Sequence, residues 1–175
     1  HRDFDGIDER ADERAVAAFE QVAAANVTYK DVFPRLSRLY AKRGARTELA
    51  ALLERRIGTV LDPEERVDLE VDRGRVLAEI GDPGAAKEAY EAAFAAGAEA
   101  IVSIHVADTL SGTFKSAQIA RDMLPDREIH LVDSLGVSMA EGMLARMGVD
   151  LADEDRSASE IAEILEERAP DMVMY

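Results

Sequence analysis

The hydrophobic period of the chain changes near residue 98, and this change restricts the possible folds more than any other feature. Before it, apolar side chains recur about every 3.6 residues, as in an amphipathic helix; Ala15, Phe19 and Ala23 form one such stripe. After it, residues 98–106 form a nearly continuous apolar, β-branched run, and residues 127–133 form a second. Such runs are typical of strands buried on both faces of a parallel sheet. The pattern predicts a helical first half and a mixed α/β second half.

The second half is predicted to form a strand–helix–strand unit. Residues 111–124 have helical spacing and separate the two predicted strands, an arrangement that favours parallel pairing. Two further helices are expected over residues 136–150 and 157–168. A last strand is expected to start at residues 171–175, because Ala169-Pro170 interrupts the helical pattern before it.

Helical stripes in the first half repeat along the chain. Leu49 follows Ala15 at an interval of 34 residues, and the next interval is slightly longer. A period near 34 is typical of arrays of helical hairpins. Residues 12–96 resemble the tetratricopeptide repeat family, in the segments 39–44 and 81–86. The resemblance implies a protein-interaction scaffold, with residues 1–11 as a leader or partial helix.

Composition removes several classes of function. The 175 residues carry 36 acidic and 21 basic side chains, a net charge of −15, which argues against binding nucleic acid or an anionic membrane. The absence of cysteine excludes disulfides and thiolate chemistry, and three scattered histidines leave little material for a zinc site. We therefore expect no metal and no cofactor. Without a long apolar span or a signal-peptide pattern, a soluble, cytoplasmic protein is expected.

One basic segment stands out in this acidic chain. It lies between Arg35 and Arg56, and we define its first part as the arginine patch, made of Arg35, Arg38, Lys42, Arg43 and Arg46. On a helical repeat, such a patch suits an acidic peptide or protein partner. The alternative is a solvated face whose charges pair with nearby carboxylates.

The sharpest local signal for ligand binding follows the first predicted strand. Ser111, Gly112 and Thr113 lie between that strand and a helix, at the carboxyl edge of the sheet, where ligands collect in α/β folds. The hydroxyls and the free amides of the helix N-terminus suit a carboxylate or phosphate, and Gly112 allows close backbone approach. The alternative is that Ser111 or Thr113 only caps the helix.

A hydrolase triad of Ser111, His105 and Asp133 is disfavoured. No G-x-S-x-G motif surrounds Ser111, and His105 lies inside a predicted strand. His105 and His130 are instead expected to be strand residues with satisfied ring nitrogens.

Residues 90–106, 110–117 and 132–139, in this order and spacing, resemble the DegV family. The resemblance covers about residues 86–175 and implies a two-lobed α/β protein that binds a long-chain fatty acid and is not an enzyme. It places the polar end of the lipid pocket in two loops, with the ligand-binding residues Ser111, Gly112, Thr113, Asp133 and Ser134.

The chain also departs from that family. Ala107 stands where the family usually has a serine, and the early Thr-Asp-Ser and Thr-Thr-Ser segments do not occur. The family's second lobe would follow Tyr175.

We interpret the chain as a chimera, natural or engineered. Helical repeats over residues 12–96 are followed by a partial DegV-like α/β domain over residues 86–175, and the two share one helix. Three functions stay open: binding of a fatty acid or other acyl lipid, a protein-interaction scaffold, and a recombined fold with no evolved ligand. Unpaired edges of the truncated sheet would favour a homo-oligomer.

Overall fold

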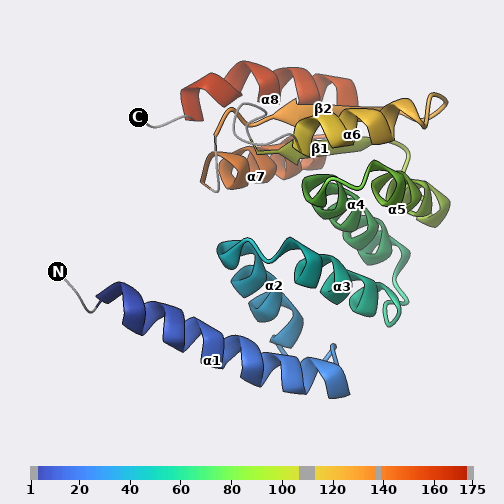
Figure 1. Ribbon diagram of the computed structural model, residues 1–175. Helices are drawn as coiled ribbons and strands as arrows, with labels where there is room; N and C mark the ends of the chain where they lie inside the picture. Colours follow the sequence, from blue (N-terminus) through green and yellow to red (C-terminus); the bar gives the residue numbers. More distant parts are fainter. Residues whose placement is uncertain (1–3, 107–112, 137–138, 173–175) are drawn as a thin grey trace. The chain divides into compact units, whose positions relative to one another are not determined.

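The computed structural model describes residues 4–106, 113–136 and 139–172 (Figure 1). It divides into two compact units, His1–Leu61 and Asp62–Tyr175. The first unit is helical, and the second combines helices with a small parallel sheet.

The first unit consists of α1 (Phe4–Ala25), α2 (Val32–Arg43) and α3 (Arg46–Ile57). Helix α2 packs against both α1 and α3. It ends at Gly44, whose φ of +66° is a left-handed conformation that glycine adopts without strain. The fully buried side chains of Leu36 and Leu52 contribute to the core of this unit.

A hairpin of two helices opens the second unit. These are α4 (Pro63–Ile80) and α5 (Pro83–Ala96), and they are in extensive contact. The turn has a clear cause in the sequence: Gly81 ends α4 at a φ of +90°, and the Asp82 carboxylate caps α5 by accepting from the Ala85 N–H at 3.0 Å. Pro83 then starts α5, where no backbone donor is needed.

The sheet consists of strands β1 (Ile101–His105) and β2 (Ile129–Asp133), which run parallel. Ile101 pairs with Ile129, and the register continues to His105 opposite Asp133. Helix α6 (Thr113–Asp122) connects the strands. Among the described residues no other strand pairs with these two.

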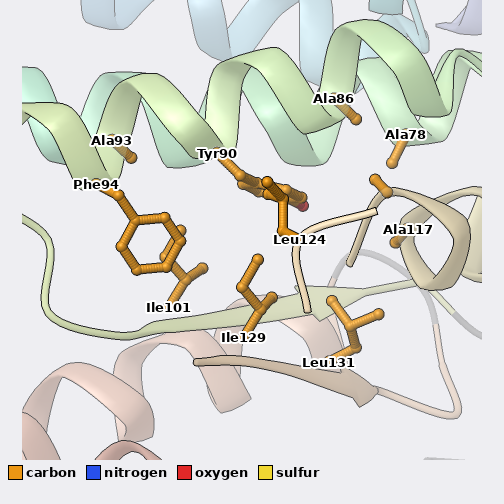
Figure 2. Packing of buried hydrophobic residues seen from close by; sticks show 11 residues of the cluster. Ala78, Ala86, Tyr90, Ala93, Phe94, Ile101, Ala117, Leu124, Ile129 and Leu131 are labelled. Atoms are coloured by element: carbon orange, nitrogen blue, oxygen red, sulfur yellow. The ribbon is translucent and has the colours of Figure 1, made fainter. Parts of the chain in front are cut away.

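Helices cover both faces of the sheet. Figure 2 shows side chains of α5, among them Tyr90 and Phe94, above Ile101 and Ile129 of the strands. Helix α6 adds Ala117 to the same cluster. Because successive strand residues point to opposite faces, Ile104 and Val132 face the other layer. That layer is formed by α7 (Met139–Asp153) and α8 (Ala158–Met172).

The predicted mixture of helices and a parallel strand–helix–strand unit is confirmed, whereas the tetratricopeptide character of the helices stays a prediction. The second compact unit begins at Asp62, earlier than the α/β domain expected from residue 86, because α4 packs on α5, α6 and β1.

The prediction of a strand over residues 171–175 is wrong for its first two residues. Helix α8 contains Pro170 and continues to Met172; residues 173–175 lie outside the described residues. Ala169 is buried and Met172 packs against the same apolar cluster. This packing holds the last turn in the helix although proline lacks an N–H donor.

Candidate functional site

The carboxyl edge of the sheet is where the chemically interesting side chains of the second unit gather. Strand β1 ends at His105 and β2 at Asp133, two residues that are partners in the register. Helix α6 starts at Thr113 and α7 at Met139, each following one of these strands. This edge is the usual position of ligands in parallel α/β folds.

Those predicted ligand-binding residues that the structure describes lie at this edge. Thr113 is the first residue of α6, while Ser111 and Gly112 lie outside the described residues. Asp133 accepts a hydrogen bond from the Leu135 N–H at 2.8 Å. The fully buried Ser134 hydroxyl donates to the Gly136 carbonyl at 3.0 Å. Both side chains therefore also shape the turn that follows β2.

A buried chain of polar side chains runs from α5 into β1. The Tyr90 hydroxyl lies 3.2 Å from the Ser103 hydroxyl, which lies 3.0 Å from Nε2 of His105. All three side chains are buried, Tyr90 and His105 completely. This row of hydrogen-bonded side chains was not predicted from the sequence. The feature that could have revealed it is the pair of polar residues, Ser103 and His105, at alternate positions of an otherwise apolar strand, because alternate positions lie on one face of the strand.

His105 is neutral at physiological pH. Burial, reinforced by the positive charge of Arg75, lowers its pKa from 6.5 to about 3. The ring of Phe114 packs edge-on against the imidazole, with ring centres 6.0 Å apart. The expectation that both ring nitrogens are satisfied is wrong for His105, since Nδ1 is buried without a hydrogen-bond partner among the described residues. For His130, Nε2 lies 2.9 Å from the Glu128 carboxylate.

An ion-pair network lies next to the hydrogen-bonded side chains of Tyr90, Ser103 and His105, and it joins α4 to α7. Arg75 contacts Glu79 at 2.7 Å and Glu141 at 3.3 Å. Burial alone would lower the pKa of Arg75, but the carboxylates of Asp72, Glu79 and Glu141 raise it above its usual value. Arg75 is therefore a fixed cation near His105 and Tyr90.

The arginine patch lies in the first unit, on α2 and the start of α3. Lys42 pairs with Asp12 at 2.6 Å, and Arg43 reaches Glu13 at 3.9 Å. Arg35 pairs with Asp31 one turn earlier, and Arg46 donates to the Ala41 carbonyl. Arg38 is exposed on the surface. Much of the patch thus follows the alternative reading, in which basic side chains pair with nearby carboxylates.

The described parts of the chain carry neither a metal-ion cluster nor a membrane-spanning helix. No group of three or more histidine or acidic side chains there has a geometry that would hold a metal ion. No described helix is both long enough and apolar enough to cross a bilayer.

The second unit is a parallel strand–helix–strand fold, covered by helices on both faces, with polar groups at the carboxyl edge; it is thus an α/β domain of the kind that binds ligands at this edge. The family described as "Uncharacterised protein, DegV family" matches residues 76–175. The chain belongs to the DegV family.

Curated relatives support this assignment. A DegV domain-containing protein of Clostridium acetobutylicum is 36% identical over 70 residues, which are 40% of this chain and 25% of the relative. One from Lactococcus lactis is 36% identical over 81 residues, or 44% of this chain and 28% of the relative. One from Caldanaerobacter subterraneus is 34% identical over 70 residues, with 40% and 25% covered. The match therefore spans about a quarter of the length of these relatives. No solved structure matches the chain significantly.

Proposed function

We propose that the chain binds a long-chain fatty acid or another acyl lipid without transforming it. The proposal is supported above all by membership of the DegV family over residues 76–175, a family that is generally associated with binding fatty acids. The carboxylate of the lipid would bind at the carboxyl edge of the sheet, near Ser111, Gly112, Thr113, Asp133 and Ser134.

The carboxyl edge of the sheet offers the hydrogen-bond donors that a lipid carboxylate needs. Thr113 begins α6, and a helix N-terminus has free N–H groups and a partial positive charge that favour an anion. Ser134 follows β2 directly, on the neighbouring strand. The hydroxyls of Ser111 and Thr113, together with the free N–H groups at the start of α6, would donate to the two oxygens of one carboxylate.

Native mass spectrometry of the protein purified from a bacterial host, followed by lipid extraction under denaturing conditions, tests the proposal. About one fatty acid per chain is expected. An empty, folded protein that also takes up no added oleate would contradict the proposal.

A matched pair of variants tests the assigned residues. Ser111→Ala with Thr113→Ala removes two hydroxyls at the site, and the affinity for oleate should fall about tenfold or more. Thr47→Ala with Ser159→Ala removes one exposed threonine and one exposed serine elsewhere, and the affinity should not change. Equal affinities for the two double variants would reject the site.

A second candidate function is the binding of an acidic peptide by the arginine patch. Arg38 and Lys42 are both exposed on α2, one turn apart, and this observation favours it. Arg38→Glu should then weaken binding of a labelled oligoglutamate peptide, measured by fluorescence anisotropy. Arg146→Glu, a charge reversal at an exposed position of α7 in the second unit, is the control. Self-association through the sheet edges is also proposed, and sedimentation velocity at increasing protein concentration tests it.

A further inference from the structure

The imidazole of His105 carries a polar atom that the described part of the protein leaves unused. The side chain is completely buried, and Nδ1 has no hydrogen-bond partner among the described residues. A buried polar atom without a hydrogen-bond partner destabilises the folded protein. His105 is the last residue of β1, so this atom lies at the sheet edge where the lipid carboxylate is proposed to bind.

The neighbouring hydroxyls favour one tautomer of the imidazole. Either hydroxyl can donate across the 3.2 Å contact between Tyr90 and Ser103, and a phenol is a better donor and a poorer acceptor than an aliphatic hydroxyl, which favours Tyr90 as the donor. Ser103 then has its own proton available for Nε2 of His105, 3.0 Å away. A neutral imidazole has a single N–H. With Nε2 accepting, that N–H is on Nδ1, which is therefore a donor in search of an acceptor.

The surroundings of the ring favour an acceptor with negative charge. Burial keeps the imidazole neutral, and the positive charge of Arg75 reinforces this effect. The Asp133 carboxylate, opposite His105 in the register, already accepts from the Leu135 N–H. The edge-on contact with Phe114 holds the plane of the ring, so the direction of the Nδ1–H bond is fixed before a ligand arrives.

We propose that the Nδ1–H group of His105 donates a hydrogen bond to the carboxylate of the bound fatty acid, which makes His105 a headgroup-binding residue held in place by Ser103 and Tyr90. This inference rests on the proposed function. It adds a residue from inside the strand to the loop residues already assigned, and it favours a ligand with an anionic oxygen over an alcohol, because a hydrogen bond to a charged acceptor is stronger.

Two amide substitutions separate the two ring nitrogens. In His105→Asn the amide group takes the place of Nδ1, whereas in His105→Gln it takes the place of Nε2 and keeps the contact with Ser103. Binding of oleate and of oleyl alcohol is measured for wild type and both variants, with circular dichroism as a check of folding. We expect His105→Gln to weaken oleate binding about tenfold, which corresponds to about 1.4 kcal/mol. The affinity of His105→Asn for oleate should stay within about threefold of the wild-type value.

The preference for oleate over oleyl alcohol should shrink in His105→Gln by the same factor, a change that a purely structural role of His105 would not produce. An unchanged preference in a folded variant would overturn the inference.

A measurement on the unmodified protein does not depend on the variants folding. In protein labelled with ¹⁵N-histidine, the Nδ1–H proton of His105 should move downfield when one equivalent of oleate is added. A resonance that stays in place while oleate binds would overturn the inference and leave the proposed function intact. A wild-type protein that binds no oleate would overturn both.

Discussion

The ring of Tyr90 lies directly against the backbone of Gly74: a methyl group at Gly74 would lie 2.5 Å from Cε1 of Tyr90, well inside van der Waals contact. Gly74 is buried in the middle of α4, and Tyr90 is completely buried on α5. The missing side chain of one helix therefore provides the space for the ring of the other. This contact also fixes the position of the tyrosine hydroxyl that begins the chain to Ser103 and His105.

Gly74→Ala should destabilise the second unit, although alanine is the better helix former. The methyl group would force the ring of Tyr90 or the whole helix to move, and overpacking of this kind costs about 1 to 3 kcal/mol. Urea unfolding followed by circular dichroism measures the effect. Gly142→Ala is the control: Gly142 lies exposed in α7 with nothing within 4 Å of an added Cβ. That change should stabilise by about 0.5 to 1 kcal/mol, and similar effects of the two substitutions would contradict the close packing.

Ser103→Ala should destabilise the protein more than Tyr90→Phe does. The serine hydroxyl connects two buried groups, so its loss leaves both the Tyr90 hydroxyl and Nε2 of His105 unsatisfied, at a cost of about 2 to 4 kcal/mol. Tyr90→Phe removes one end of the chain and keeps the bond between Ser103 and His105, at a cost of about 1 kcal/mol. Denaturant unfolding of both variants tests this order, and the reverse order would show that the hydroxyls are not connected in this way.

Stability should fall on acidification because of His105. Its folded-state pKa of about 3 lies below the ordinary value of 6.5, so between these values the unfolded chain binds the extra proton. The contribution of this group is complete above pH 6.5 and is lost as the pH falls toward about 3, with a slope of at most about 1.4 kcal/mol per pH unit.

Carboxylates titrate in part of the same range, so the comparison is made with His105→Gln. The unfolding free energy of wild type should decrease more steeply with falling pH than that of the variant. The difference between the two slopes should correspond to about one additional proton taken up on unfolding. Parallel curves would show that His105 is protonated in the folded protein, against its burial.

Asp82→Ala should loosen the start of α5. The Asp82 carboxylate accepts from the Ala85 N–H, and the loss of such a cap costs about 1 kcal/mol. Glu88→Ala removes the same charge from an exposed position farther along α5, and we expect a change of no more than about 0.5 kcal/mol. Hydrogen exchange of the amides in the first turn of α5 should speed up in Asp82→Ala and not in Glu88→Ala.

Much of the local structure was predictable because it depends on neighbours in the sequence. The apolar run around Ile101 and Ile104 predicted a buried strand, and Gly81, Asp82 and Pro83 supply the signals that end one helix and begin the next. The helical reading of residues 113–122 also follows from local spacing. These features need only the periods of side chains and the conformational preferences of single residues.

The prediction that the chain leaves the helix before residue 171 was wrong because a local signal competed with packing. Proline weakens a helix by removing one donor, but Ala169 and Met172 on the same turn pack against Leu165 and its neighbours. Apolar burial on that face outweighs the missing hydrogen bond. The period alone does not reveal which effect is larger, because the neighbouring surfaces come from other elements.

Local sequence patterns predict the kinds of elements, their order and the sheet edge at which Thr113, Asp133 and Ser134 lie, because strand direction and chain connection follow from such patterns. The hydrogen-bonded row of Tyr90, Ser103 and His105 beside Arg75, and the burial of Nδ1 of His105 without a partner in the described residues, arise only when the helices pack on the sheet. Hydrogen bonds, burial and the lowered pKa of His105 depend on groups brought together from α4, α5 and β1. Their distances are set by the packing of whole helices on the sheet.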